Sequence, residues 1–296
     1  MKIHVVVPAF REGKLVPSFL ESWAGIIDHE VEIYLVNGNP GDETSALLRA
    51  WSGRCRVREI QGSPDRFWTG LVNLGLRAVA ETIGSDDAVV LTNIDVKFEG
   101  DPVSGMLRRS GGLENRQLTL PVVGSGGKVL SAGVRVRSWS FSLNRHLFDG
   151  ITAADLPADT LVEATYLPTR FVLLPAKALL EGHLPNEEHL PHYCADYEYT
   201  NRLRSCGYQP CIVTGPVVEI AEGNTGLDTY SLGTTFRSRL EGIGDIKCPY
   251  HFRYRFHFVR LTYPAAALIP GMVTHFTKIF LEIIFGGRQL DRFRVR

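Results

Sequence analysis

Several features that define other protein classes are missing from these 296 residues. The five cysteines form no C-x-x-C pair and are odd in number, which argues against a zinc site or a disulfide framework and fits a reducing cytosol. No G-x-G-x-x-G loop follows the first apolar run, and Pro8–Gly13 is not a glycine-rich basic loop. These absences exclude a dinucleotide dehydrogenase and a sugar-nucleotide pyrophosphorylase. No signal peptide with a small-residue cleavage site is recognised.

A net charge is also missing, because Lys plus Arg and Asp plus Glu number 32 each. The charges are unevenly distributed, however, since Lys247–Arg296 holds nine Lys or Arg and only two acids. A basic tail on an acidic body predicts an anionic partner, either lipid head groups or nucleic acid. The 44% of hydrophobic residues is ordinary for a globular protein that buries a sizeable core.

Strand-like and helix-like runs alternate through the first hundred residues. Strands are expected at Ile3–Val7, Glu32–Val36, Val57–Ile60 and Ala88–Thr92, and helices at Lys14–Ile27, Thr44–Trp51 and Thr69–Ile83. This alternation predicts an α/β fold in which helices flank a mostly parallel central sheet, as in a Rossmann fold. Ligands bind at the carboxyl ends of such strands, where Pro8–Glu12, Asn37–Asp42 and Asn93–Asp95 supply polar clusters.

The second half is less regular. A hairpin is expected between Leu118–Val123 and Val129–Val136, with its turn at Ser125-Gly126-Gly127. Asp196–Cys206 is predicted to be a helix that Gly207 ends, and Pro210–Val213 another strand.

The tail combines aromatic, basic and amphipathic segments. Tyr250–Tyr263 interleaves aromatic residues with arginines, and an amphipathic helix is predicted to follow it. Its apolar face comprises Met272, Val273, Phe276, Ile279, Phe280, Ile283 and Ile284, opposite Thr274, His275, Thr277, Lys278 and Glu282. Pro264, Pro270 and the polar face argue against a membrane-spanning helix. Either an interfacial membrane helix or a helix packed on its own domain fits this pattern.

Asn93-Ile94-Asp95 is the candidate metal site, because it follows an apolar strand. A carboxylate there can hold a hard divalent cation that neutralises charge on a diphosphate. The simpler interpretation is a turn or a helix cap.

Asp196 and Glu198 lie at the start of a predicted helix. A carboxylate there can remove a proton from an acceptor hydroxyl, with His192 and Tyr193 lining an acceptor groove. Acids in a first helical turn also simply complement the helix dipole.

A third candidate site precedes the helix Thr69–Ile83. Backbone N–H groups of Thr69 and Gly70 can bind phosphate, with Arg66 nearby. Trp68 fits either a ligand contact or a core anchor.

Together these segments resemble the family 2 glycosyltransferases of the GT-A fold, particularly the rhamnosyltransferase-like branch. The resemblance spans most of residues 3–226. It is carried by Val5–Glu12, Leu35–Thr44, Phe67–Arg77, Leu91–Val96, and Pro191–Tyr199 continuing to Arg202 and Gly207-Tyr208. Leu91–Val96 matches the D-x-D region in an Asn-x-Asp form, and Pro191–Tyr199 matches the E-D-x-D helix.

The resemblance implies roles for individual residues. Phe10 would stack on the nucleobase, Asn37 would take the place of a base-reading Asp, Asp95 would bind the metal and Asp196 would be the catalytic base. The donor site would comprise Pro8, Phe10, Glu12, Asn37, Arg66, Trp68, Thr69, Asn73, Asn93 and Asp95, and the acceptor site His192, Tyr193 and Glu198. This sequence departs from the family at Asn93, Ala195 and Asn37. Where the family often carries a metal-facing His, Glu219 or Glu222 lies nearest.

The implied protein is an inverting glycosyltransferase that moves a sugar from a nucleotide-diphosphate donor to a hydroxyl of a glycan or lipid-linked acceptor, in bacterial cell-surface polysaccharide synthesis. UDP- or dTDP-sugars are favoured as donors, with Mn²⁺ or Mg²⁺ as cofactor, and no nucleic-acid partner is expected. The catalytic domain is expected to span 1–245, with a nucleotide-sugar half (1–100) and an acceptor half (101–245), before the extension 246–296. A cytoplasmic location is expected, with peripheral membrane contact through 250–290. The alternative is a catalytically weak or inactive module that binds a nucleotide-sugar or glycan at the membrane.

Overall fold

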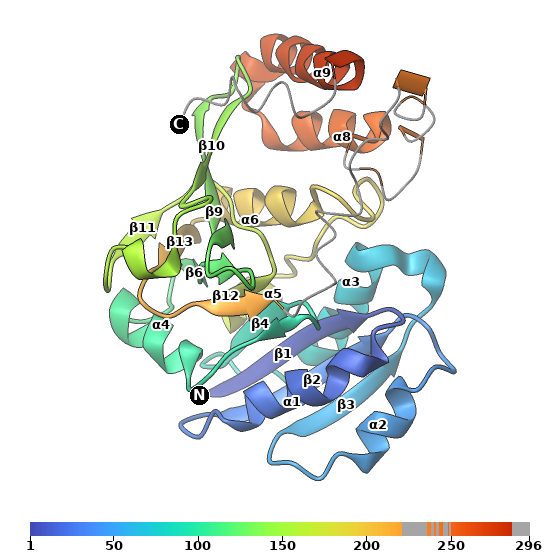
Figure 1. Ribbon diagram of the computed structural model, residues 1–296, viewed down its shortest axis with the longest axis vertical. Coiled ribbons are helices and arrows are strands. Elements are labelled where there is room, and N and C mark those ends of the chain that lie inside the picture. The colour runs from blue at the N-terminus through green and yellow to red at the C-terminus, as the bar shows by residue number, and fades with distance from the viewer. Residues whose placement is uncertain (221–235, 238–239, 241–242, 245–247, 249, 286–296) are drawn as a thin grey trace.

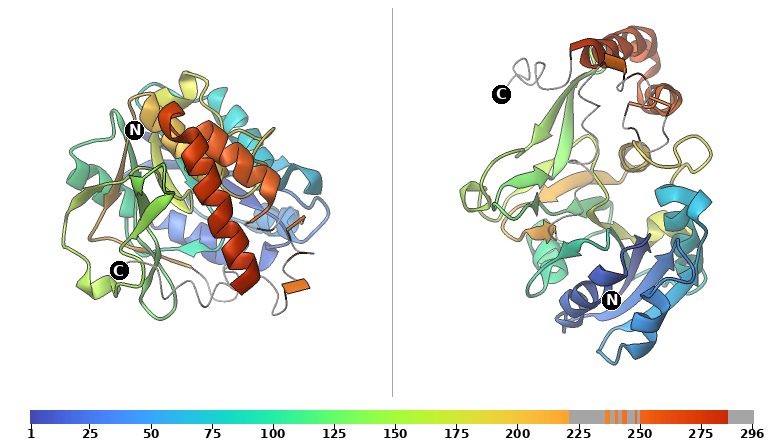
Figure 2. Two further views of the ribbon diagram at one scale, coloured as in Figure 1. Left: turned by 90° about the horizontal axis from the view of Figure 1, so that it is seen from above. Right: turned by 45° about the vertical axis from the view of Figure 1, so that its right-hand side comes forward.

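A large sheet and a pair of helices occupy opposite ends of the molecule (Figure 1). The computed structural model describes residues 1–220, 236–237, 240, 243–244, 248 and 250–285. The two helices are α8 (Phe252–Thr262) and α9 (Leu268–Phe285). A hairpin of β9 (Gly133–Ser138) and β10 (Leu143–Leu147) reaches from the body of the molecule toward α9. Seen from above, α9 lies across this end of the molecule, beside α8 (Figure 2).

The N-terminal half of the large sheet follows the predicted alternation. Its strands are β1 (Lys2–Ala9), β2 (Glu30–Asn37), β3 (Arg56–Gln61) and β4 (Ala88–Thr92), and the helices between them are α1 (Val16–Ala24), α2 (Thr44–Ala50) and α3 (Phe67–Ala80). All pairs among these strands are parallel, in the order β4-β1-β2-β3. Their carboxyl ends therefore share one edge, where the predicted polar clusters lie.

The other half of this eight-stranded sheet mixes directions. Its strands are β6 (Arg116–Thr119), β11 (Leu161–Glu163), β12 (Phe171–Pro175) and β13 (Gln209–Val213), accompanied by α4 (Pro102–Ser110), α5 (Ala176–Leu180) and α6 (Ala195–Ser205). β12 lies antiparallel between β4 and β6, β6 and β13 are parallel, and β11 is antiparallel to β13. Parallel pairs are thus the majority in the sheet, and the predicted α/β class is confirmed.

A second sheet contains β5 (Val96–Lys97), β14 (Val218–Ile220), β7 (Val122–Val123) and β8 (Val129–Ser131), in that order. The hairpin expected around residues 125–127 is β7–β8, and it is shorter than predicted. Leu118 and Thr119 belong instead to β6, where they pair with the buried strands β12 and β13. Val134 belongs to β9.

Alternating side chains of β1 supply the core on both faces of the sheet. Val5 and Val7 lie in one hydrophobic cluster with Trp23 of α1, whereas Val6 lies in another with Leu76 of α3. α3 approaches the sheet closely at Gly75, because a Cβ there would lie 2.5 Å from Cγ1 of Val6. The close approach fixes where α3 begins relative to the carboxyl edge of the sheet.

An aromatic cluster holds the start of β12. Trp23 stacks on Phe171 at 5.8 Å between ring centroids, and Phe98 meets Trp23 edge-on at 5.1 Å. All three side chains are buried. Removing a buried ring of this kind costs about 3–5 kcal/mol, so the residue before Phe171 is set in a firmly anchored position.

The tail helices pack on the body rather than standing apart. A third hydrophobic cluster joins Cys194 and Ala195, at the start of α6, to Tyr254 and Phe258 of α8. Nδ2 of Asn201 on α6 also contacts the carbonyl oxygen of Thr262 at 3.4 Å. α8 is therefore a neighbour of the helix that carries Asp196.

Candidate active site

Asp95 lies in the turn between β4 and β5, at the carboxyl edge of the parallel strands. Only 6% of the residue is exposed, and Oδ1 is buried without a hydrogen-bond partner among the described residues. Burial raises the pKa of Asp95, while the positive charge of Arg170 opposes this rise. A buried polar atom left unpaired costs about 1–3 kcal/mol. Such an atom is typical of a position that a ligand completes.

Glu12, in the loop after β1, is the second acid at this edge. Its Oε2 accepts a hydrogen bond from the backbone N–H of Phe10 at 3.2 Å. Burial and, to a smaller extent, the negative charge of Asp95 raise the pKa of Glu12 to about 7, against the hydrogen bond from Phe10. Arg11, between Phe10 and Glu12, has φ of 58°, a left-handed backbone that non-glycine residues rarely adopt. The loop thus places two carboxylates near each other.

Arg170 is a site residue that the sequence reasoning missed. Its carbonyl oxygen accepts hydrogen bonds from Oγ1 of Thr92 at 2.9 Å and from the N–H of Asn93 at 3.3 Å. These bonds fix Arg170 beside the turn that contains Asp95. Nη1 of Arg170 is buried without a hydrogen-bond partner among the described residues. Its charge lowers the pKa of both Asp95 and Asp196, so the guanidinium acts on both acids.

Asp196, the predicted base, is half-buried in the first turn of α6. Cys194 caps this helix with φ of 68°, again a left-handed backbone. Burial raises the pKa of Asp196 to about 6, against the backbone N–H of Tyr197 and the charges of Arg170 and Arg255. A carboxylate with this pKa is ionised near pH 7 and binds a proton more strongly than an ordinary Asp, which suits a general base.

Arg255 brings the C-terminal region into the site. It projects from α8, with its guanidinium 5.8 Å from the ring centroid of Tyr250. Its charge favours the ionised form of Asp196. The predicted basic aromatic stretch therefore supplies a cation that acts on the candidate base.

Glu198, predicted to bind the acceptor, makes its contacts inside the protein. Its side chain is 2% exposed, and Oε1 lies 2.7 Å from Nε of Arg202. Nη2 of Arg202 also donates to the carbonyl oxygen of Leu184 at 2.7 Å. Glu198 points into the protein and neutralises Arg202, so it does not face an acceptor.

Thr69 and Asn73, predicted to lie in the donor site, are likewise bonded within the protein. The N–H of Thr69 donates to the carbonyl oxygen of Pro191 at 3.0 Å, and its Oγ1 donates to that of Leu190 at 2.7 Å. Nδ2 of Asn73 donates to the carbonyl oxygen of Pro185 at 2.9 Å. Both side chains are buried. Because the loop before α6 occupies these groups, α3 positions the base rather than the phosphate.

Asn37 is likewise occupied, by its own loop and by Glu59 of the neighbouring strand β3. Its Nδ2 contacts carboxylate oxygens of Glu59 at 3.2 Å and Asp42 at 3.3 Å, and its Oδ1 accepts from the N–H of Asn39 at 2.9 Å. Asn37 is fully buried. In this structure it shapes the turn after β2, and the direct reading of a nucleobase by its side chain is not supported.

The other predicted residues lie around the same edge. Pro8 is buried, Phe10, Trp68, Asn93, His192 and Tyr193 are half-buried, and Arg66 is exposed. Their donor or acceptor roles stay predictions. Glu219 forms an exposed ion pair with Lys97 at 3.3 Å, and Glu222 lies outside the described residues.

A divalent cation would have a small ligand set here. Within the described part of the chain, no group of three or more His, Cys, Asp or Glu side chains could hold a metal ion. The unpaired Oδ1 of Asp95 is nevertheless a hard oxygen donor, with Glu12 nearby. Mg²⁺ commonly binds through one or two carboxylates, water and substrate phosphates. Asp95 therefore fits a divalent cation whose remaining ligands come from a bound diphosphate and water.

Comparison with solved structures identifies this architecture. S. aureus TarS 1–349 in complex with UDP-GlcNAc matches with a TM-score of 0.56 and 13% identity, covering 96% of this chain and 82% of that chain. GalNAc-T7 with UDP, GalNAc and Mn²⁺ matches at 0.57 and 12%, covering 98% and 57%. The mannosyltransferase PcManGT from Pyrobaculum calidifontis with GDP-Man and Mn²⁺ matches at 0.52 and 14%, covering 98% and 80%.

The chain has the GT-A fold. It spans 43% of a longer S. aureus TarS chain that matches at a TM-score of 0.53. The sequence matches no protein-family model and no curated protein. The GT-A fold places Asp95, Glu12 and Arg170 at the carboxyl edge of the sheet, with Asp196 on the helix beside it.

Proposed function

We propose that this protein is an inverting glycosyltransferase that moves a sugar from a nucleotide-diphosphate donor to a hydroxyl of a glycan or lipid-linked acceptor. One observation carries the proposal: Arg170 acts on both the unpaired carboxylate of Asp95 and the raised-pKa carboxylate of Asp196, at the carboxyl edge of a GT-A sheet. The neighbours solved with UDP, UDP-GlcNAc and GDP-Man support a nucleotide-diphosphate donor. UDP- and dTDP-sugars are the favoured donors.

In this mechanism, Asp196 accepts the proton of the acceptor hydroxyl. The hydroxyl oxygen forms a bond to the anomeric carbon as the bond from that carbon to the diphosphate oxygen breaks, so one displacement inverts the centre. The half-buried Arg170, whose Nη1 is buried without a partner among the described residues, stabilises the negative charge that grows on the departing diphosphate. A Mn²⁺ or Mg²⁺ ion held by Asp95 supplies additional charge neutralisation when it is bound.

We further propose that the acceptor belongs to bacterial cell-surface polysaccharide synthesis and that the enzyme works in the cytoplasm, at the inner face of the membrane. The resemblance to the rhamnosyltransferase-like branch supports this placement, together with the basic tail. The contact of α8 with α6 is consistent with an acceptor that arrives from the side of the C-terminal helices.

A nucleotide-sugar screen tests the proposal. Release of nucleoside diphosphate is measured with UDP-, dTDP- and GDP-sugars, in Mn²⁺ and in EDTA. We expect the wild type to turn over one class of donor. In Asp196→Asn the rate of this turnover should fall about a thousandfold. Glu198→Gln is the matched control, because this acid lies on the same helix but faces the protein, and it should retain turnover.

The inactive module is the second candidate, and Asn93 together with the small ligand set favours it. Saturable binding of a nucleotide-sugar that EDTA does not change, with no release from any donor, would establish the module and rule out the transferase.

A further inference from the structure

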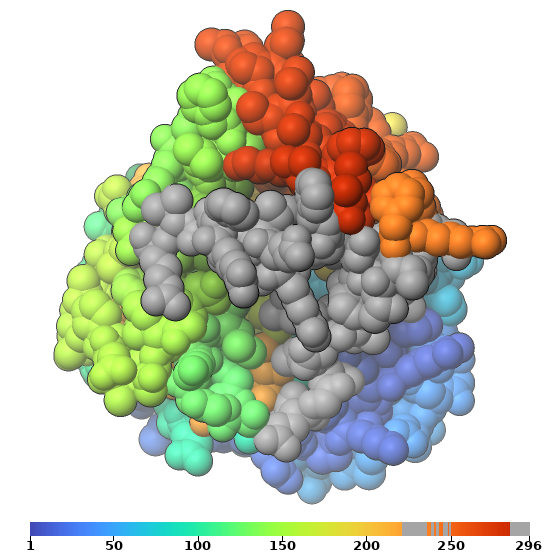
Figure 3. Space-filling view, turned by 45° about the horizontal axis from the view of Figure 1, so that its top comes forward, coloured from blue at the N-terminus to red at the C-terminus, as the bar shows by residue number. Residues whose placement is uncertain are grey.

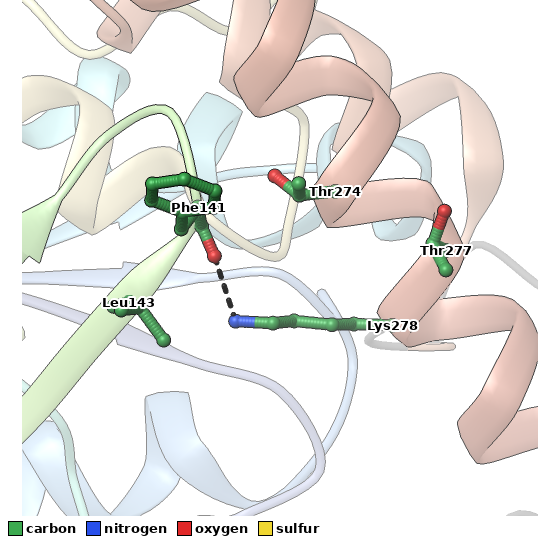
Figure 4. Close-up of a pocket in the computed structure, with 5 residues that line it drawn as sticks. All are labelled: Phe141, Leu143, Thr274, Thr277 and Lys278. Atoms are coloured by element: carbon green, nitrogen blue, oxygen red, sulfur yellow. Dashed lines mark hydrogen bonds between the residues drawn. The ribbon is translucent and has the colours of Figure 1, made fainter.

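Helix α9 bonds two of its polar side chains to the β9–β10 hairpin. Oγ1 of Thr274 donates to the carbonyl oxygen of Ser140 at 2.8 Å. Nζ of Lys278 donates to the carbonyl oxygens of Phe141 at 2.9 Å and Ser142 at 2.8 Å (Figure 4). These partners lie at the tip of the β9–β10 hairpin. The hairpin thus binds two polar side chains of α9, while Lys278 and the neighbouring Thr277 keep contact with water.

His275 also faces inward. Its ring lies 6.4 Å from those of Phe258 and Tyr263, between centroids. Burial lowers the pKa of His275 to about 3, and the charges of Arg255 and Lys278 add to this, so the side chain is neutral at physiological pH. Ile279 and Ile283 fill the rest of the inward side.

A stripe of large apolar side chains is left on the outward side of α9. Ile269, Val273, Phe280 and Ile284 are 77%, 62%, 57% and 37% exposed. They recur at steps of four, seven and four residues, which keeps them on one face of a helix. A helix at a water-exposed surface normally presents its polar face outward. α9 instead exposes these four large apolar side chains, alongside the exposed Thr277 and Lys278.

Two further elements extend this stripe. Phe141 and Leu143 at the hairpin tip are 64% and 46% exposed, and they line an open pocket of about 380 Å³ with Thr274, Thr277 and Lys278 (Figure 4). In the space-filling view, the green hairpin tip adjoins the red α9 (Figure 3).

On α8, Phe252 and Phe256 are 41% and 45% exposed, and Phe252 stacks on Phe276 of α9 at 5.5 Å. We call the set the apolar cap: Phe141, Leu143, Phe252, Phe256, Ile269, Val273, Phe280 and Ile284.

Two of the three segments that carry the cap, the hairpin and α8, are basic, and α9 has one Lys and one Glu. Residues 133–147 contain Arg135, Arg137 and Arg145 and no acid, and α8 contains three arginines and no acid. Arg253 and Arg260 of α8 are exposed, as are the three arginines of the hairpin. Large apolar side chains flanked by cations match the acyl chains and anionic head groups of a membrane surface.

We propose that the apolar cap docks this protein on the surface of an anionic lipid bilayer, with α9 lying in the plane of the interface. Residues 265–284 are long and apolar enough to cross a membrane, and 22% of the segment is buried in the protein. Crossing would break the contacts of Thr274 and Lys278 with the hairpin, whereas docking keeps them. The proposal does not depend on catalysis, because it rests on surface composition alone.

Vesicle flotation of the full chain tests the docking. The vesicles contain phosphatidylcholine alone or equal parts phosphatidylcholine and phosphatidylglycerol. The cap variant is Val273→Gln with Phe280→Gln. The control is Ile27→Gln with Leu180→Gln, which removes apolar side chains of similar exposure (65% and 52%) outside the cap. A second cap variant, Phe141→Gln with Leu143→Gln, tests the hairpin.

We expect the wild type and the control to float with the anionic vesicles, and the first cap variant to lose binding by about tenfold or more. The hairpin variant should lose less. Wild-type binding should weaken on phosphatidylcholine alone and in about 0.5 M NaCl. All variants should keep the wild-type melting temperature and donor turnover in solution, which separates this test from that of the proposed function.

Two results would overturn the docking surface. One is equal flotation of the wild type and both cap variants, or no flotation of any of them. The other is a wild-type dimer, seen by light scattering, that the first cap variant converts to a monomer. The cap would then be a contact between two copies of the chain.

Discussion

The ends of β2 and β4 lie at the same edge of the sheet, and each carries a buried polar residue, yet the two are bonded differently. Asn37, the last residue of β2, makes three hydrogen-bond contacts, two with the loop that follows and one with Glu59 of β3. Asp95 after β4 leaves Oδ1 without a partner among the described residues. Both positions look equivalent in the sequence. The bonding separates them: a satisfied polar residue shapes a loop, and an unsatisfied one is available to a ligand.

The same contrast recurs on α6 between Asp196 and Glu198. The ion pair with Arg202 occupies Glu198. Asp196 has no side chain of opposite charge within ion-pair distance among the described residues, and burial raises its pKa to about 6. Glu198 therefore stabilises the helix, whereas ionised Asp196 weakens the fold and is free to accept a proton.

The largest expected effect comes from Asp196→Asn, which should change activity and stability in opposite directions. Turnover should fall about a thousandfold because the base is lost. The pKa is about 6 in the folded chain and about 4 in the unfolded chain, so the fold loses stability as pH rises from about 4 to about 6, and the loss is complete above pH 6. The neutral amide should therefore raise the free energy of unfolding near pH 7, by about 1–3 kcal/mol. Denaturant melts at pH 7 measure this gain.

The pH profile supplies the control for Asp196. The wild-type kcat/KM should fall about tenfold per pH unit below about pH 6, because protonated Asp196 cannot accept the acceptor proton. The stability gain of the variant should vanish near pH 4, where the wild-type carboxyl is protonated. A fall of kcat/KM centred near pH 4 would contradict the description of Asp196 as a desolvated base. So would equal free energies of unfolding of the wild type and Asp196→Asn at pH 7.

Arg170→Met should give the second-largest effect. Removing one preorganised donor to a developing anion commonly costs about a hundredfold in kcat. Loss of this positive charge should also raise the pH below which kcat/KM falls, because Arg170 lowers the pKa of Asp196. Arg108→Met is the matched control, since Arg108 is exposed on α4, outside the predicted site. If both variants lose equal activity and neither changes the pH of this fall, Arg170 has no special place in the site.

Glu198→Gln should change stability more than chemistry. The substitution weakens the contact with Arg202, and hydrogen bonds to charged groups contribute about 1.5–3 kcal/mol. Because 34% of the Arg202 side chain is exposed, water partly compensates and the loss should lie at the lower end. Thermal melts measure it. A large rise in the acceptor KM at unchanged melting temperature would restore the acceptor role.

Thr69→Val should have the smallest effect. The variant removes the hydrogen bond to the carbonyl oxygen of Leu190, at a cost of about 1 kcal/mol. Since this bond holds the loop before α6, kcat should fall slightly while the donor KM stays unchanged. Kinetics at saturating acceptor measure both. A donor KM that rises severalfold would return Thr69 to the phosphate site.

Local sequence patterns predicted well the parallel strands whose carboxyl ends form the candidate site. β4 was placed within its observed bounds because five consecutive apolar or small residues end abruptly at Asn93. Helices α3 and α6 followed from the spacing of apolar residues and from Gly207. The position of Asp196 on α6 was predicted for the same reason, since it depends on the chain near it.

Long-range partners could not be predicted in this way. Arg170 meets Asn93 through a strand pairing that spans 77 residues of chain, and only the apolar run Phe171–Pro175 hinted that a strand begins there. The periodicity of α9 gave an apolar face but not which side looks outward. That side is set by the hairpin around Ser142, more than a hundred residues earlier.

The contact between α8 and α6 has a practical consequence for handling this protein. An aggregation-prone C-terminal segment is often deleted to obtain a soluble sample. Truncating this chain before α8 would remove Tyr254 and Phe258 from the hydrophobic cluster around Cys194. It would also remove the cation of Arg255 that favours ionised Asp196. A shortened chain would therefore report the behaviour of a damaged site, and detergent or single surface substitutions are the safer route to a soluble enzyme.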